Sequence, residues 1–232
     1  HTALTDTTTV NGKSWTTTIT RAPYLMMYRS TSPRGRISDT VIDGKGRVTL
    51  QQGPQIAGVT TEAVSYEWAA DGKLSAITQG TAPAPRRMDI LYYAATDSAT
   101  GALKGEIATI IDPLDRTVDF EYDAMGRVTR QIFEKGTADE RDILYTYDAS
   151  GNVLSIAPAG RPEHDFHYNL VDLPDRYSAP QVGEVPPDMV HTFYNYNLDR
   201  QRESIVRPDG TTNGMIYEFV DSGYTANTGK LM

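Results

Sequence analysis

The 232-residue sequence contains no cysteine, and this absence excludes several kinds of chemistry at once. Disulfide scaffolds, thiolate metal sites and cysteine nucleophiles all require that side chain. The sequence also has no apolar run near the roughly 20 residues of a membrane-spanning helix, and no secretory signal opens it. We therefore expect no membrane insertion, and we expect the sequence to be an interior piece of a longer protein.

Positive charge and helical periodicity are also scarce. The sequence has 22 Lys and Arg against 30 Asp and Glu, which gives a net charge of −8. This balance disfavours binding to a phosphate backbone, so nucleic acid is not an expected partner. Apolar residues at helical spacing never persist for three turns, so we expect almost no helix.

A repeated turn motif fills the sequence instead. Residues 42–48, 122–128 and 147–153 share an apolar or aromatic residue, Asp, two free positions, Gly, a polar residue and Val. Asp at the first turn position can accept a backbone hydrogen bond, and Gly at the fourth supplies the positive φ of a tight reversal. Looser copies lie near residues 70 and 100, with turns that differ by one or two residues in length. The residues that define the motif are Asp43, Gly46, Asp71, Gly72, Gly101, Tyr122, Asp123, Gly126, Arg127, Tyr147, Asp148 and Gly151.

The segments around each turn alternate between apolar and polar residues. Val118, Phe120 and Tyr122 alternate with polar residues before one turn, and Val128 begins the return segment. Period two is the signature of a strand, so each repeat predicts a β-hairpin. The predicted fold is all-β, an array of antiparallel β-hairpins that forms a curved strip or an open piece of a β-shell.

We divide the sequence into two parts. Residues 1–35 are rich in threonine but carry no turn motif, which predicts a non-repeating, strand-rich lead-in. Residues 36–232 form the repeat array, with about eight hairpin units that become degenerate after about residue 160. There the motif becomes Tyr168-Asn169 and Tyr196-Asn197, with Asn in place of Asp and the glycine lost. A last candidate copy runs from Tyr217 to Leu231.

The copies at residues 122–128 and 147–153 resemble the tyrosine–aspartate (YD), or Rhs, repeat. That repeat occurs in bacterial Rhs and wall-associated proteins, insecticidal toxin complexes and animal teneurins. The resemblance implies a β-sheet strip that spirals into a hollow shell, often around a C-terminal toxin domain. In such shells the repeats form the wall, and any catalytic activity belongs to the enclosed cargo domain. Family members commonly carry an autoproteolytic segment with spaced Asp-Pro-x-Gly motifs, whereas here Asp112-Pro113 is followed by Leu114-Asp115. We therefore expect the sequence to stop short of the cleavage site.

No catalytic, metal-binding or cofactor-binding residue is predicted. Asp112 and Asp115 are close in sequence, but 30 carboxylates make such pairs common, so we assign them to turns. The repeat aspartates lack the clustered acidic neighbours of a calcium loop. His164 and His167 point to opposite faces of a strand, and His191 stands alone, so we interpret all three as solvent or packing residues.

Tyrosine far outnumbers phenylalanine, with 14 Tyr against 5 Phe, and its positions are informative. Because Tyr122, Tyr147, Tyr168 and Tyr196 recur at one repeat position, we favour a ladder that joins neighbouring hairpins over a carbohydrate site. Tyr92, Tyr93 and Tyr194 stay as weak candidates for ligand binding.

The predicted function is a non-catalytic shell segment of a secreted or cell-surface bacterial protein of the polymorphic-toxin or wall-associated kind, with a cytoplasmic stage before export. Expected partners are the remaining shell repeats and a C-terminal cargo domain, with self-association through unpaired strand edges. The alternative is an adhesion or carbohydrate-binding module that uses exposed tyrosines. A third option is an enzyme whose active residues lie in loops.

Overall fold

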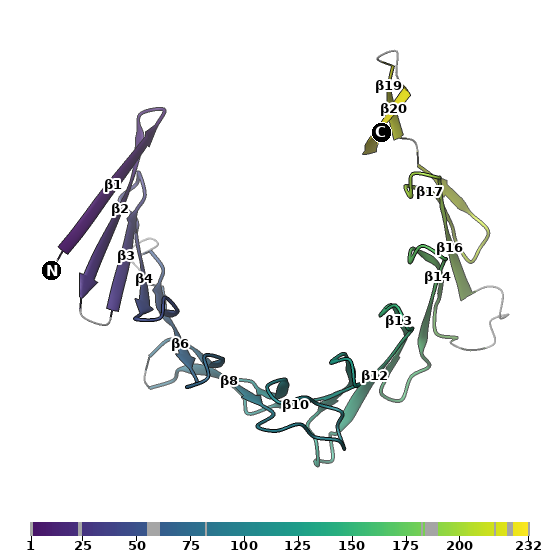
Figure 1. Cartoon of the computed structure of the whole chain (residues 1–232), viewed down its shortest axis with the longest axis horizontal. Helices are drawn as coiled ribbons and strands as arrows, with labels where there is room; N and C mark the ends of the chain where they lie inside the picture. Colours follow the sequence, from purple (N-terminus) through teal and green to yellow (C-terminus); the bar gives the residue numbers. More distant parts are fainter. Residues whose placement is uncertain are drawn as a thin grey trace. The chain divides into compact units, whose positions relative to one another are not determined.

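The computed structural model describes residues 2–22, 25–54, 61–81, 83–181, 183, 190–215, 217–221 and 225–231. These residues contain no α-helix, and the paired strands among them run antiparallel, so the all-β prediction is confirmed (Figure 1). The chain divides into two compact units. The first unit comprises residues 1–97 and 103–119, and the second comprises residues 98–102 and 120–232.

The first unit is built from strands that pair with their neighbours in sequence. Each strand from β1 to β9 pairs with the next, and β9 pairs with the beginning of β10. The threonine-rich lead-in supplies β1 to β3. The strands are β1 (Thr2–Val10), β2 (Lys13–Ala22), β3 (Leu25–Thr31), β4 (Ile37–Asp43), β5 (Val48–Gln52), β6 (Val64–Trp68), β7 (Leu74–Gln79), β8 (Arg86–Tyr92) and β9 (Ile107–Ile111).

The second unit repeats the same architecture. Each strand from β11 to β17 pairs with the next, and β19 and β20 form a separate two-stranded hairpin. Strand β10 contributes residues to both units. The strands are β10 (Thr117–Tyr122), β11 (Val128–Phe133), β12 (Arg141–Tyr147), β13 (Val153–Pro158), β14 (His164–Tyr168), β15 (Pro174–Ser178), β16 (His191–Tyr196), β17 (Arg202–Val206), β18 (Thr212–Gly214), β19 (Tyr217–Asp221) and β20 (Thr225–Leu231).

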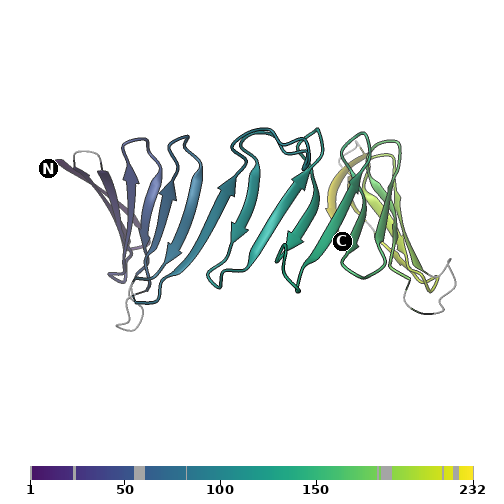
Figure 2. The ribbon, with the colours of Figure 1, turned by 90° about the horizontal axis from the view of Figure 1, so that it is seen from below.

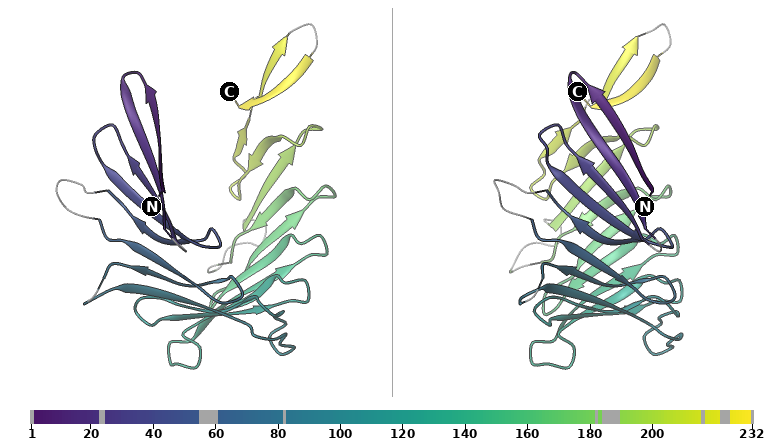
Figure 3. Two further views of the ribbon diagram at one scale, coloured as in Figure 1. Left: turned by 60° about the vertical axis from the view of Figure 1, so that its left-hand side comes forward. Right: turned by 90° about the vertical axis from the view of Figure 1, so that its left-hand side faces the viewer.

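The strands of each unit lie side by side in one layer (Figures 2 and 3). Among the described residues only Ala76, Ala102 and Ile132 are buried apolar side chains. Most domains pack a second layer of structure against the apolar face of a sheet. Here most strand residues are half-buried, so the contacts between neighbouring hairpins carry an unusual share of the stability.

The turn at Asp43 shows how the repeat motif reverses the chain. The Gly46 N–H donates to the Asp43 carbonyl at 3.0 Å, and the Asp43 N–H donates to the Arg47 carbonyl at 2.9 Å. The Asp43 carboxylate accepts the Lys45 N–H at 2.8 Å, and Gly46 has φ +82°. This is a type I turn followed by a left-handed bulge residue, one of the common hairpin connections. The pairing of β4 with β5 shifts register between Val41 and Ile42, just before the turn.

The same pair of backbone hydrogen bonds recurs along both units. Where glycine is missing at the fourth position, Asp115, Asp172 and Arg200 adopt φ values of +60°, +59° and +61°. The motif therefore persists in the copies beyond residue 160 although the glycine is lost. In the described residues these turns begin at Ser32, Asp43, Ala69, Asp112, Asp123, Asp148, Asn169, Asn197 and Arg207.

Two copies of the motif are aligned differently from the sequence prediction. The turn that contains Asp71 has the standard length, because it begins at Ala69 and closes at Gly72, which leaves Asp71 at the third position. Gly101 does not close its hairpin. The Gly105 N–H donates to the Tyr93 carbonyl at 2.8 Å, so residues between them form a longer loop.

Asp112 and Asp115 lie in a turn, as the sequence predicts, and this turn is also a complete copy of the repeat motif, in which Asp115 takes the place of glycine. The last candidate turn, at residues 228–231, lies within β20 instead, and the connection between β19 and β20 falls outside the described residues.

We predict that Gly151→Ala destabilises the β12–β13 hairpin. Gly151 has φ +96°, a conformation that costs a residue with a Cβ roughly 1–2 kcal/mol. Native-state hydrogen exchange of the β12 and β13 amides measures the free energy of opening. The control is Ser150→Ala in the same turn, which should change that free energy by less than about 0.5 kcal/mol. Equal effects of the two substitutions would contradict this explanation of the glycine.

Candidate functional site

Several of the turns hold a basic side chain in a fixed position. The Arg47 guanidinium donates to the Asp43 carboxylate through Nε at 2.8 Å and through a terminal nitrogen at 2.6 Å. The Arg47 backbone N–H donates to the same carboxylate at 3.0 Å. The Arg47 side chain, followed by its backbone N–H, lowers the pKa of Asp43 to about 2. Arg127 is held in the same way by Asp123, with Nε and Oδ2 2.6 Å apart.

The basic side chain reaches the aromatic residue of the next hairpin. The centre of the Arg127 guanidinium lies 4.6 Å from the centroid of the Tyr147 ring. Arg47 lies 5.2 Å from the Trp68 ring in the first unit. Such cation–π contacts stabilise by about 0.5–1 kcal/mol at exposed sites and by more when they are desolvated. Lys73 and Tyr92 form a third contact of this kind, at 5.1 Å.

The polar atom of the same aromatic residue bonds back to the preceding hairpin. The Tyr147 hydroxyl donates to the Val128 carbonyl at 2.7 Å, and the Trp68 indole donates to the Val48 carbonyl at 2.8 Å. Burial of the Tyr147 ring raises the pKa of its hydroxyl. We call this arrangement of turn residue, basic residue and aromatic residue the hairpin junction. Two further aromatic-to-carbonyl bonds, both 2.8 Å long, are Tyr92 to Leu74 and Tyr196 to Pro174.

Of two turns without the basic residue, one keeps the aromatic bond. Asn152 occupies the basic position after Asp148, and its amide donates to Asp148 at 2.9 Å and to Asp172 of the next turn at 3.0 Å. Leu173 occupies that position before Pro174, whose carbonyl accepts the Tyr196 hydroxyl. The aromatic-to-carbonyl bond is thus the more widespread part of the junction.

The three candidate tyrosines lie in different settings. Tyr92 belongs to a junction, so its hydroxyl and one ring face are already engaged. Tyr93 begins the long loop, and its backbone bonds to Gly105 and Glu106. Tyr194 lines an open groove in the second unit.

The groove of about 450 Å³ crosses strands β13 to β16, and we call it the aromatic groove. Its lining residues are Ile156, Pro158, His164, Phe166, Tyr177 and Tyr194. His164 Nδ1 and the Tyr177 hydroxyl are 2.7 Å apart, and their rings stack at 6.0 Å. The Phe166 and Tyr177 rings pack at 5.3 Å. This groove was not predicted from the sequence, and the available signal was Tyr177 in β15.

His167 and His191 face away from the aromatic groove. His167 Nδ1 lies 2.5 Å from an Asp175 oxygen, and His191 Nδ1 lies 2.8 Å from the Ser178 hydroxyl. Asp165 lies opposite Ser178 in the strand register, so the three residues lack the order of a Ser-His-Asp triad. The pair of Ser178 and His191 matches the cross-strand polar pairs that recur on the face of the strands opposite the aromatic groove.

Among the described residues, no group of three or more His, Cys, Asp or Glu side chains is placed to hold a metal ion. In the same part of the chain, no helix is long and apolar enough to cross a membrane. Asp112 and Asp115 occupy the first and fourth positions of one turn, where the Asp112 carboxylate binds Arg116 with Nε and Oδ2 2.7 Å apart.

We predict that Asp43 contributes to stability in a pH-dependent way. Because its folded pKa of about 2 lies below the ordinary value of 3.8, its contribution is present above pH 4 and is lost as the pH falls through 2. Asp43→Asn should therefore weaken the β4–β5 hairpin at pH 7, and its difference from the wild type should shrink between pH 4 and pH 2. NMR titration of the Asp43 carboxyl measures the pKa directly. A midpoint near 4 would contradict the assigned contact with Arg47.

The fold is similar to parts of much longer toxin chains. The crystal structure of TcdB2-TccC3-TEV matches with a TM-score of 0.55 at 14% identity, over 92% of this chain and 12% of that one. A TccC3 mutant of the Photorhabdus luminescens Tc holotoxin pore matches with a TM-score of 0.57 at 12% identity, over 86% and 12%. The crystal structure of TcdB2-TccC3 matches with a TM-score of 0.56 at 11% identity, over 94% and 16%. No protein-family model and no curated protein matches the sequence. At these identities the likeness establishes a shared fold, and this chain spans only 12 to 16% of the chains it matches.

Proposed function

We propose that this chain is a non-catalytic structural segment of a large secreted or cell-surface protein of the Rhs type. In this proposal its hairpins form part of a β-shell around a toxin or cargo domain. The observation that carries the proposal is the hairpin junction, which repeats in both units and uses its distinctive side chains to join neighbours. The fold shared with the TcdB2-TccC3 structures supports it, as does the resemblance of the motif to YD repeats.

The two faces of the sheet suit a wall between different environments. In β6, Val64 and Tyr66 point to one face, whereas Ser65 and Glu67 point to the other. The polar face carries cross-strand ion pairs such as Arg29 with Asp39, joined by two hydrogen bonds of 2.7 Å. A solvated face tolerates such pairs, while the apolar face has no second layer over it in the described residues. An enclosed cargo or further repeats would cover that face.

Further repeats are the expected neighbours of this segment. Antiparallel hairpins extend a sheet by pairing their outer strands, and the same edges can pair with a second copy when repeats are missing. We therefore propose the remaining shell repeats and a cargo domain as partners, with self-association as the behaviour of an isolated segment.

Protease protection in the parent protein tests the proposal. With the parent expressed at full length, the segment encoded after the repeats should resist a protease that digests the same segment expressed alone. Combining Gly126→Val with Gly151→Val should remove this protection, because both glycines need positive φ and valine is β-branched. The matched control combines Ala124→Val with Ser150→Val at neighbouring turn positions. A cargo segment digested equally fast in the intact parent would overturn the shell function.

The alternative function is an adhesion or carbohydrate-binding module. Tyr194 is the candidate that the structure favours for this role, because it lines the aromatic groove while Tyr92 is engaged in a junction.

A further inference from the structure

The long loop between β8 and β9 contains a short segment that bonds to the end of β10. The Tyr122 N–H, at the end of β10, donates to the Thr100 carbonyl at 2.7 Å. Ala102, two residues further along the loop, is fully buried. Residues Ser98–Ala102 belong to the second unit together with the end of β10. We call this segment the strap.

The strap takes a place that a strand usually fills. In the described residues, β9 pairs with β10 through Thr117, Val118 and Asp119. Three residues further along β10, the Tyr122 N–H donates to the strap. The hydrogen-bond partner of β10 therefore changes from a strand to a loop before the strand ends.

Gly101 lets the strap approach β10 closely. Its φ is +71°, and a Cβ at this position would collide with the Tyr122 carbonyl oxygen. Gly136 has a similar φ of +78°, but a Cβ there would meet no atom within 4 Å apart from its chain neighbours. The two glycines therefore separate the energetic cost of positive φ from the cost of the close approach.

One atom of the strap opposes the closed position. Thr100 Oγ1 is buried and, within the described part of the chain, has no hydrogen-bond partner. A buried hydroxyl of this kind loses its hydrogen bonds to water without replacing them. Opening of the strap hydrates the hydroxyl again, so this atom lowers the free energy of opening.

The base of the loop is closed by bonds that do not involve the strap. The Gly105 N–H donates to the Tyr93 carbonyl at 2.8 Å, and the Tyr93 N–H donates to the Glu106 carbonyl at 2.9 Å. Loops whose ends lie close together form compact units, and such units can open locally while the adjoining strands stay paired. The strap can therefore leave β10 without separating β8 from β9.

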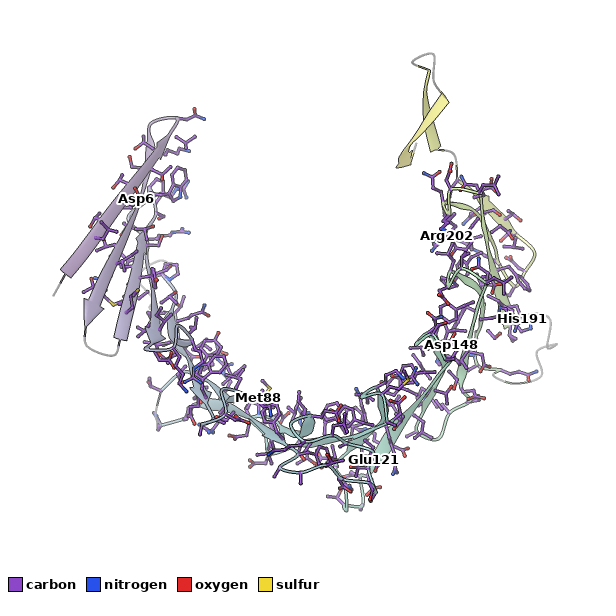
Figure 4. All side chains as sticks on the ribbon, in the orientation of Figure 1. Asp6, Met88, Glu121, Asp148, His191 and Arg202 are labelled. Atoms are coloured by element: carbon purple, nitrogen blue, oxygen red, sulfur yellow. The ribbon has the colours of Figure 1, made fainter. Side chains whose placement is uncertain are left out.

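The β11 side of β10 is also held independently of the strap. The Asp123 N–H donates to the Arg127 carbonyl at 2.9 Å. The Glu121 side chain, labelled in Figure 4, pairs with Arg130 of β11 at 3.5 Å. Release of the strap therefore leaves the hairpin of β10 and β11 in place.

We propose that the strap is a conformational switch, which opens locally and exposes the end of β10 while the neighbouring strands stay paired. In the closed state it holds the backbone of Tyr122, the residue at the aromatic position of the repeat. In the open state the Tyr122 N–H loses its acceptor. The switch does not depend on the shell function, so failure of one leaves the other standing.

Native-state hydrogen exchange of the 232-residue chain tests this inference. In the wild type, the Tyr122 amide should exchange faster than the paired amides of β8 and β9, because the strap opens without them. Gly101→Ala should accelerate exchange at Tyr122 about tenfold or more, because the Cβ collides in the closed state. Thr100→Val should slow it about fivefold or more, because it removes the buried hydroxyl and keeps the shape of the side chain.

Two matched controls accompany these variants. Gly136→Ala changes a glycine of similar φ without the close approach, and it should alter exchange at Tyr122 by less than about twofold. Thr109→Val removes a hydroxyl that is bonded to Asp119 at 2.8 Å, so it should not slow exchange. The amides of β12 and β13 report whether each variant stays folded.

Three results would overturn the inference. One is exchange of the Tyr122 amide at the same rate as the amides of β8 and β9, which would mean that the strap does not open alone. The second is an equal effect of Gly101→Ala and Gly136→Ala at Tyr122. The third is unchanged or faster exchange in Thr100→Val, a variant that is expected to fold because it stabilises the closed state.

Discussion

The constraint on which this structure depends is that, in the described residues, no second layer covers the strands of either unit. A single layer cannot bury its side chains fully, and the described residues include only three buried apolar ones. The hairpins must therefore be held by their neighbours. The hairpin junction meets this need, because Arg127 from one turn stacks on Tyr147 of the next hairpin, and Tyr147 bonds back to Val128. Each junction joins only neighbouring hairpins, so the array can extend without a common core.

This arrangement makes the protein resemble a linear repeat array in its energetics. Each hairpin gains stability from contacts with the hairpins beside it, so stability is a sum of local terms. The composition of the junction changes along the chain, from Arg47 and Arg127 to Asn152 and Leu173 at the basic position. At Leu173 the junction therefore has no basic residue and depends on the Tyr196 bond to the Pro174 carbonyl.

Sequence reasoning reached the parts of the fold that are set locally. The turns at Asp43, Asp123 and Asp148 follow from side chains within four residues, so the motif alone specifies them. Asp112 and Asp115 were assigned to a turn, but that turn was not recognised as a copy of the repeat because Asp115 replaces the glycine and takes positive φ at some cost in energy. Gly101 was wrongly assigned as the turn glycine of its repeat. It lies within a long loop, and Gly105 closes the hairpin.

The aromatic groove was beyond local reasoning for a different physical reason. It depends on which residues of β13 to β16 lie opposite one another, and that register is known only from the paired strands. The tyrosine ladder was partly accessible, because its spacing indicated contact between hairpins. The acceptor atom of each hydroxyl could not be predicted, because a backbone carbonyl is present whatever the residue type.

The most direct test of the hairpin junction is a double-mutant cycle between Arg127→Met and Tyr147→Leu. The free energy of opening of β11 to β13, from native-state hydrogen exchange, is measured for the wild type, both single variants and the double variant. The junction predicts a coupling energy of at least about 0.5 kcal/mol, because each single substitution already removes the shared contact. A control cycle between Arg127→Met and Tyr66→Leu, in separate units, should be additive. Additivity within about 0.3 kcal/mol for Arg127 and Tyr147 would contradict the claim that this contact joins neighbouring hairpins.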